Sequence, residues 1–259
     1  MFGIISGSGL YDIPGLEIVD SVKISTPYGE PSDVFRIGDL SGKKIAFLPR
    51  HGIMHHLQPH KINYRANIWG FRELGVNRII SIGASGGISI GMSPGVIAVP
   101  DQLIDMTKGR PSTFYDEDEV IHIDFTVPFC PDMRNYILNA AGKAGVAVAG
   151  SGTYLCTNGP RLETAAEIRA FATLGCDMVG MTVMPEAALA RELEICFAGI
   201  NVITNHAAGI KAEKLTAKEV VETMQASSGK LKSIFKAFFA QDFPERGCPC
   251  AQALKNAKI

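Results

Sequence analysis

Short apolar runs alternate with segments of helical periodicity along the whole chain. Runs of four to eight mostly apolar residues bounded by turn-forming residues are typical of buried strands. Such runs predict strands at residues 3–6, 33–37, 44–48, 78–82, 95–99, 152–156, 177–181 and 197–204. Apolar residues three or four positions apart predict helices at residues 63–74, 131–144, 162–173, 185–194 and 216–240.

This order of elements predicts the fold class. Strands that alternate with helices form a parallel or mixed sheet covered by helices on both faces. The chain has no internal repeat and no low-complexity linker, so we expect one α/β domain at residues 1–243. A short tail follows at residues 244–259 and contains Cys248-Pro249-Cys250. Thr216 with Glu219 three positions later is a capping box, which supports the start of the last helix.

Composition and charge exclude several classes of protein. The 259 residues are 46% hydrophobic, enough for a sizeable core, and 25 basic residues face 26 acidic ones. A net charge of −1 predicts neither a nucleic-acid groove nor an anionic membrane surface as partner. The apolar start at residues 1–7 lacks a basic segment and breaks at glycine, so it predicts a first strand and not a signal peptide. No run of about 18 apolar residues occurs, and we expect a cytoplasmic protein.

The six cysteines lie at positions 130, 156, 176, 196, 248 and 250. No two of them have the Cys-x-x-Cys spacing that is common in zinc sites. In a cytosolic protein we therefore expect reduced thiols, several of them buried. Cys248 and Cys250 differ because they lie in a polar tail where burial does not explain them. A redox or disulfide role for this pair and a reduced state both stay open.

Glycine-rich segments follow four of the predicted strands, at residues 6–9, 83–87, 158–160 and 205–209. In α/β sheets such loops meet at one edge, so we expect them to open onto one crevice. The first is not a dinucleotide fingerprint, because Asp12 stands where glycine or alanine is needed and Pro14 interrupts any following helix. Its backbone amides and the Ser8 hydroxyl suit an anion, although an ordinary tight turn has the same composition.

Arg50 and His51 follow the strand predicted at residues 44–48. The planar arginine fork matches phosphate oxygens, and His51 beside it offers another hydrogen-bond donor. A solvated arginine at a strand end is the alternative. Four histidines, at positions 51, 55, 56 and 60, have pairwise helical spacing, but Gly52 and Pro59 argue against a helix and the cluster holds no carboxylate. We therefore predict a polar, pocket-lining loop and no metal.

Glu163 and Asn205 form the most informative pair. A 6-oxopurine has a donor at N1–H and acceptors at O6 and N7, which match a carboxylate and an amide. Taken singly, Glu163 has a simpler interpretation as a first-turn acid of the helix at 162–173, and Asn205 as a turn residue.

Together, these segments resemble the trimeric purine nucleoside phosphorylase and methylthioadenosine phosphorylase family over residues 3–239. The matching stretches are Gly7-Ser8-Gly9-Leu10, Arg50-His51-Gly52, Asn63-Tyr64-Arg65-Ala66-Asn67, Gly159-Pro160-Arg161-Leu162-Glu163-Thr164, Gly180-Met181-Thr182, Met184-Pro185-Glu186 and Asn205. The resemblance implies a mixed, partly barrel-like sheet flanked by helices. It implies phosphorolysis of a purine nucleoside to free base and sugar 1-phosphate, with phosphate as co-substrate and no metal or organic cofactor.

The resemblance also implies site residues. Ser8, Arg50, His51, Gly83, Ala84 and Thr182 would hold phosphate, with His51, Glu163 and Asn205 as the catalytic set. Met181 would lie under the sugar, and the base would meet Leu162, Glu163, Asn205, His206 and Ala207. Leu162 stands where relatives often carry an aromatic ring, which weakens the stacking expected there.

The base side and the sugar side of the site each sort the substrate within this family. Members that act on 6-aminopurines carry aspartate at the positions of Asn205 and Ala207, so Glu163 with Asn205 implies a 6-oxopurine. Members that cleave ordinary ribonucleosides carry histidine where this chain has Ala217, which leaves room for a 5′-methylthio group. We therefore expect methylthioinosine as the substrate, with inosine and guanosine slower. Methylthioadenosine phosphorylase is the nearest alternative, and a purine-binding regulatory protein without turnover is a more distant one.

The resemblance further implies a homotrimer, which pairs in some cases into a hexamer, with His122 and its neighbours completing the pocket of an adjoining subunit. Hot-adapted members often carry a C-terminal Cys-x-Cys and internal disulfides. Cys130 with Cys196 is the other candidate bridge, and the pairing of the tail cysteines stays open.

Overall fold

The computed structural model describes residues 1–259 except 8, 11, 12, 14, 118 and 213–215. Its strands are β1 (Phe2–Ser6), β2 (Glu17–Val22), β3 (Phe35–Leu40), β4 (Lys43–Pro49), β5 (Arg78–Gly87), β6 (Ile97–Ala98), β7 (Gln102–Asp105), β8 (Val148–Ala149), β9 (Thr153–Cys156), β10 (Met178–Gly180) and β11 (Cys196–His206). Its α-helices are α1 (Tyr64–Glu73), α2 (Pro131–Lys143), α3 (Ala165–Thr173), α4 (Val183–Glu192) and α5 (Ala217–Phe239). Two 3₁₀ turns, η1 (Pro59–Lys61) and η2 (Pro249–Gln252), complete the set.

The sheet is mixed and branches at β5. Its main path runs β2-β3-β4-β1-β5-β10-β9-β7, while β11 pairs with both β5 and β6. β1 and β11 lie parallel to β5 on either side, whereas β10 meets the last residues of β5 antiparallel. Because β4 is also parallel to β1, the carboxyl ends of four strands, β4, β1, β5 and β11, point to one edge. The predicted single α/β domain with a mixed sheet flanked by helices is confirmed.

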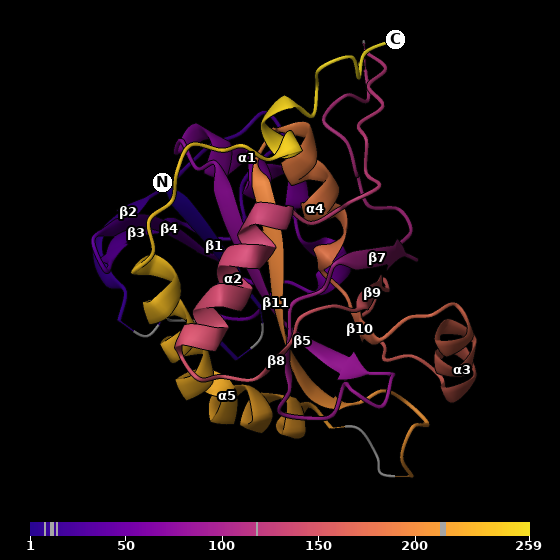
Figure 1. Cartoon of the computed structure of the whole chain (residues 1–259). Helices are drawn as coiled ribbons and strands as arrows, with labels where there is room; N and C mark the ends of the chain where they lie inside the picture. Colours follow the sequence, from indigo (N-terminus) through magenta and orange to yellow (C-terminus); the bar gives the residue numbers. More distant parts are fainter. Residues whose placement is uncertain (8, 11–12, 14, 118, 213–215) are drawn as a thin grey trace.

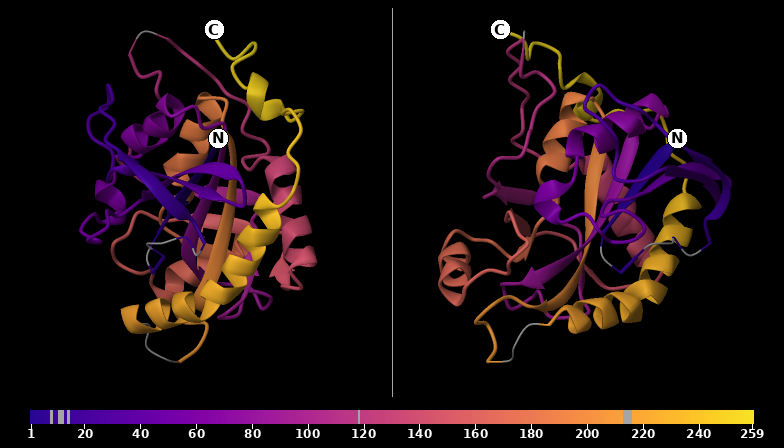
Figure 2. Two further views of the ribbon diagram at one scale, coloured as in Figure 1. Left: turned by 90° about the vertical axis from the view of Figure 1, so that its left-hand side faces the viewer. Right: turned by 180° about the vertical axis from the view of Figure 1, so that it is seen from behind.

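Helices cover both faces of this sheet (Figure 1). α2 and α5 pack on each other and on β11, and α1 and α4 pack on the opposite face. The side views in Figure 2 show α5 running along the sheet. Its inward stripe includes Phe235, Phe238 and Phe239, which are at most 1% exposed. Phe2 of β1 meets Phe238 and Phe239 edge-on at 5.8 and 5.4 Å between ring centroids, so the first strand and the last helix share one core.

The predicted strands and helices are all present, with three differences. β2 was missed because it lies at an edge of the sheet with its side chains almost all exposed, and β7 and β8 were missed because none of their residues is buried. Residues 83–87 are not a loop but the last half of β5. Glycine is required there because a Cβ on Gly87 would lie 1.7 Å from the carbonyl oxygen of Met92.

The third difference concerns α3, which begins at Ala165 and not at residue 162. Thr164 is its N-cap and forms a capping box with Glu167, with a bond from the Glu167 amide to the Thr164 hydroxyl of 3.1 Å. Glu163 therefore precedes the helix and is not a first-turn acid, which leaves its side chain free to serve a site.

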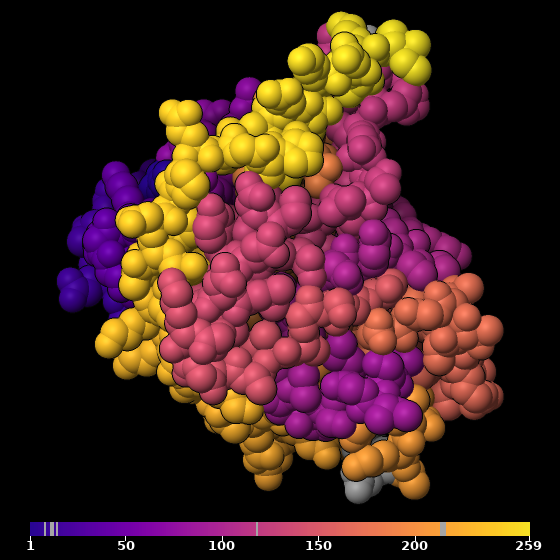
Figure 3. All heavy atoms as spheres, in the orientation of Figure 1, coloured from indigo at the N-terminus to yellow at the C-terminus, as the bar shows by residue number. Residues whose placement is uncertain are grey.

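The C-terminal residues pack onto the domain (Figure 3). Cys248 and Cys250 belong to the same core as α2 and β11. Farther along, Lys258 forms a β-bridge with Ile121, and the Ile259 amide donates to the Val120 carbonyl at 3.2 Å. None of the helices described is both long and apolar enough to cross a membrane.

Candidate active site

A cavity of about 410 Å³ opens at the edge where the parallel strands end. Its walls come from the segments that follow β1 and β4, the last half of β5, the turn from β10 into α4, the end of β11 and the first turns of α5. The segment before α3 closes one side. The single crevice expected from the glycine-rich segments is therefore present.

Most of the predicted site residues line this cavity. They are Arg50, His51, Gly83, Ala84, Leu162, Glu163, Met181, Thr182, Asn205, Ala207 and Ala217. His206 is not among the lining residues, although it adjoins two that are. Ser8 lies outside the described residues.

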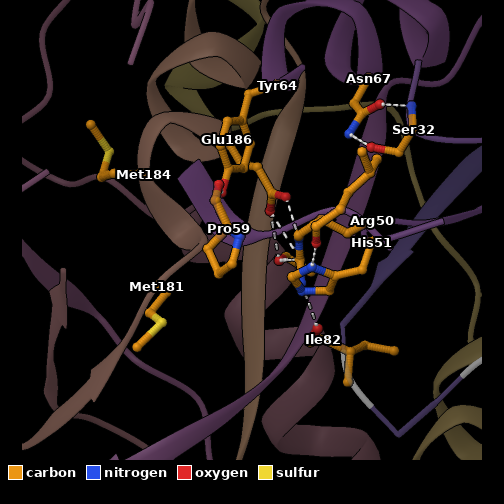
Figure 4. Close-up of polar contacts among 12 residues, drawn as sticks. Ser32, Arg50, His51, Pro59, Tyr64, Asn67, Ile82, Met181, Met184 and Glu186 are labelled. Carbon is orange, nitrogen blue, oxygen red and sulfur yellow. Dashed lines mark hydrogen bonds and ion pairs between the residues drawn. The ribbon is translucent and has the colours of Figure 1, made fainter. Parts of the chain in front are cut away.

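Arg50 is buried at the floor of the cavity and is not a solvated strand-end residue. Its Nε donates to Glu186 Oε1 at 2.5 Å and its Nη2 to Glu186 Oε2 at 3.1 Å (Figure 4). Both side chains are almost fully excluded from solvent, at 1% and 0% exposure. Burial acts against the guanidinium charge, but the Glu186 carboxylate outweighs it and raises the pKa of Arg50.

The remaining donors of Arg50 are also largely engaged. Nη2 donates to Ser81 Oγ at 2.6 Å and Nη1 to the Ile82 carbonyl at 3.2 Å. Among the described residues, four of its five N–H groups thus have partners, which leaves at most one for a ligand. Gly7 lies directly against this corner, because a Cβ there would be 2.9 Å from Nη1.

His51 is held as a neutral ring. Its Nδ1 lies 2.8 Å from the Leu57 carbonyl oxygen, a pure acceptor, so Nδ1 carries the proton and Nε2 does not. Burial, with the nearby Arg50 charge, lowers the pKa of His51 to about 4. At neutral pH the ring therefore accepts a hydrogen bond at Nε2, whereas the sequence predicted that it donates one.

The carboxylate of Glu163 and the amide of Asn205 also line the cavity. Thr157 Oγ1 donates to Glu163 Oε1 at 2.7 Å. Asn205 Oδ1 accepts from Thr204 Oγ1 at 2.9 Å, and its Nδ2 donates to the His206 carbonyl at 2.9 Å. This network fixes the orientation of the amide and leaves the second Nδ2 hydrogen available for a ligand.

Apolar side chains form a further part of the cavity wall. This apolar wall consists of Met181 with Ala217, Val220 and Val221 from the first turns of α5. Met181 is packed against Gly159, which has a φ of +61° and where a Cβ would lie 2.5 Å from the Met181 sulfur.

The sequence reasoning gave no role to two residues that build this site. Glu186 is one, and the available signal was an acid within the otherwise apolar stretch of residues 183–190. Arg110 is the other, and nothing in its sequence context marks it. Arg110 donates to the carbonyls of Met181 and Met184 at 2.7 and 2.6 Å and to that of Asn158 at 2.9 Å, so it joins two walls of the cavity.

The mixed α/β sheet and the cavity at its strand ends, with a buried arginine, a carboxylate and an amide, agree with the resemblance to the nucleoside phosphorylases. The chain belongs to the phosphorylase superfamily, whose family model matches residues 2–240.

Several named proteins are similar to this chain over nearly its whole length. It is 49% identical to the probable S-methyl-5′-thioinosine phosphorylase of Thermodesulfovibrio yellowstonii, over 99% of this chain and 97% of the relative. It is 48% identical to the 6-oxopurine nucleoside phosphorylase of Pyrococcus furiosus, over 98% and 97%. The methylthioadenosine phosphorylase of Schistosoma mansoni, solved with adenine, superposes with a TM-score of 0.89 at 31% identity, over 92% and 90%. The predicted family and fold are confirmed.

Proposed function

We propose that this protein is a phosphorylase of 6-oxopurine nucleosides that prefers S-methyl-5′-thioinosine and accepts inosine and guanosine more slowly. The observation that carries this proposal is one cavity with Glu163, an oriented Asn205 and the apolar wall of Ala217, Val220 and Val221. Glu163 and Asn205 match the base, and the apolar wall matches the 5′ substituent. The names of the relatives above agree with this substrate class.

At the base, the Glu163 carboxylate accepts from purine N1–H, and the free Nδ2 hydrogen of Asn205 donates to N7 or O6. When the glycosidic bond breaks, its electron pair moves onto the purine and negative charge builds up at N7 and O6. A donor already aimed at these atoms stabilises the transition state more than the ground state. Thr204 contributes indirectly, because its hydroxyl holds the amide in the donating orientation.

At the phosphate end, Arg50, His51, Thr182 and the backbone at Gly83 and Ala84 hold the anion, together with Ser8. The Arg50 charge is already balanced by Glu186, so N–H and O–H dipoles provide much of the binding. The bare Nε2 of His51 accepts a hydrogen bond from a P–O–H group. One unprotonated phosphate oxygen then bonds to the anomeric carbon from the face opposite the departing base, with inversion.

A 6-aminopurine fits the site less well. Its amino group needs an acceptor, but the amide orientation fixed by Thr204 and the His206 carbonyl presents the Nδ2 donor of Asn205 to the base. Relatives named S-methyl-5′-thioadenosine phosphorylase, such as that of Thermofilum pendens at 45% identity, make this the alternative to test.

The working enzyme is a cytoplasmic homotrimer, or a pair of trimers, and needs phosphate but no other cofactor. Within one chain His122 does not line the cavity; its amide bonds the Ala257 carbonyl at 2.8 Å. The neighbouring Val120 is 58% exposed, as expected for a segment that docks on another subunit. The segment would complete the pocket of that subunit.

A panel of methylthioinosine, methylthioadenosine, inosine and guanosine, each with and without phosphate, tests the proposal. We expect phosphate-dependent base release, fastest from methylthioinosine. Faster cleavage of methylthioadenosine would contradict the base assignment. Binding without any base release would identify a regulatory protein that has kept the fold.

A further inference from the structure

Four cysteines from three separate parts of the chain meet in one buried cluster. Cys130 directly precedes α2, Cys196 is the first residue of β11, and Cys248 and Cys250 lie at η2 in the tail. Their four sulfur atoms all lie within 4.8 Å of one another. Cys130 and Cys250 are 0% exposed, Cys196 1% and Cys248 6%. We call these residues the four-cysteine cluster.

The sulfurs form one group rather than two pairs. Cys196 Sγ lies 3.3 Å from Cys248 Sγ, and the Cys196 thiol also interacts with those of Cys130 and Cys250. A zinc ion bound by four thiolates has Zn–S distances of about 2.3 Å, which places its sulfurs roughly 3.8 Å apart in a tetrahedron. The cluster therefore needs only small side-chain movements to adopt that geometry.

Several groups around the cluster can offset the negative charge of thiolates, the form that binds metal. Cys130 is at the N-terminus of α2, whose dipole favours negative charge. The Cys250 amide bonds the Cys248 sulfur, and the positive charges of Arg246 and Arg191 act on Cys196 and Cys250. The helix dipole, the Cys250 amide and the two arginines can therefore offset the excess negative charge of four thiolates around one zinc ion.

We propose that the four-cysteine cluster binds one zinc ion through four thiolates and that this ion fastens the tail at residues 244–259 to the domain. The remaining thiol protons pass to solvent on binding, and no atom changes oxidation state. With all four positions taken by protein the ion is structural and has no place for substrate. This differs from the sequence prediction of no metal, which depended on the absence of a Cys-x-x-Cys pair and on a tail expected to be exposed.

The fastened tail in turn holds the segment around His122. The Lys258–Ile121 bridge and the hydrogen bonds of Ala257 and Ile259 tie the end of the chain to residues 120–122. Zinc at the cluster would therefore order this surface segment without touching the active-site cavity.

Metal analysis of the wild-type protein, purified without chelator under anaerobic conditions, tests this proposal together with thiol counting after denaturation. We expect about one zinc ion per chain, lost in Cys248→Ser/Cys250→Ser and kept in Cys176→Ser, a buried cysteine outside the cluster. Cobalt-substituted protein should show the visible bands of a tetrahedral thiolate site.

Two results would overturn the proposal. One is metal-free protein whose four cluster cysteines are joined in disulfides as isolated. The other is reduced, metal-free protein that fails to take zinc from a chromophoric chelator. Both are measured on the wild-type chain, so they decide the matter even if the double variant does not fold, and neither depends on nucleoside cleavage.

Discussion

Glu186 holds Arg50 side-on, with its two carboxylate oxygens on Nε and Nη2 at 2.5 and 3.1 Å, and the two residues are 136 positions apart in the chain. Ser81 Oγ also donates to Glu186 Oε2 at 2.9 Å, which closes the network. This arrangement fixes the guanidinium plane beside Gly7 and determines which of its N–H groups faces the cavity.

Replacing Glu186 should therefore impair both folding and phosphate binding. In Glu186→Gln the buried Arg50 charge loses its counterion, which typically costs about 3–5 kcal/mol. We expect a lower free energy of unfolding in urea and a higher KM for phosphate with a smaller change in KM for nucleoside. Glu167→Gln, which breaks the surface pair with Arg161, is the control and should leave both KM values unchanged. If the folded Glu186→Gln protein keeps the wild-type KM for phosphate, Glu186 is not needed to position Arg50 for phosphate binding.

The state of His51 predicts how stability depends on pH. Unfolded His51 takes up a proton near pH 6.5, but burial and Arg50 delay this in the folded chain to about pH 4. Between these values the unfolded state binds more protons, so the free energy of unfolding rises with pH from 4 to 6.5. The contribution of neutral His51 to stability is fully present above pH 6.5. The full shift corresponds to about 3 kcal/mol.

Urea unfolding of wild type and His51→Gln between pH 4.5 and 7 measures this contribution. The variant should lose part of the pH slope over this window, and His56→Gln, at an exposed position of the same loop, should keep it. Equal slopes for wild type and His51→Gln would mean that His51 titrates normally in the folded protein.

The amide of Asn205 should matter mainly in the transition state. Removing one such donor typically reduces kcat by about 10²–10³, and we expect this of Asn205→Ala with methylthioinosine. Thr204→Val should give a smaller loss, because the amide remains but is no longer oriented. His206→Gln is the matched control, since His206 does not line the cavity. Asn205→Asp with Ala207→Asp should shift preference toward methylthioadenosine, and a double variant with unchanged preference would argue against base reading at these positions.

Local patterns were enough to predict most of the fold. The spacing of apolar residues and the positions of glycines along the sequence located the buried strands and the five helices, because each such element must bury one face. β2 escaped because its side chains face solvent and carry no burial signal. The site residues beside the strand ends were predictable for the same reason that ligands bind there.

What the sequence did not reveal depends on long-range contacts. The partner of Arg50, Glu186, becomes evident only when segments 136 positions apart meet. The four-cysteine cluster is similar: Cys130, Cys196 and the tail pair are far apart in sequence, and no spacing rule brings them together. The state of His51 likewise follows from a backbone carbonyl, which no side-chain pattern encodes.

The start of α5 offers a direct test of sugar specificity. Ala217 is the first residue of this helix and lines the cavity with Val220 and Val221, so the wall that faces the 5′ substituent has no hydrogen-bonding side chain at these three positions. An imidazole at position 217 would add a partner for a 5′-hydroxyl and fill space needed by a methylthio group. We therefore expect Ala217→His to raise the ratio of kcat/KM for inosine to that for methylthioinosine by about tenfold, which corresponds to about 1.4 kcal/mol, within the range of one hydrogen bond. Lys218→His is the control, because it places the same ring one position farther along α5. Lys218 pairs with Glu222 at the surface, so this variant should leave the ratio unchanged. If both variants keep the wild-type ratio, the 5′ group is recognised by residues outside this wall.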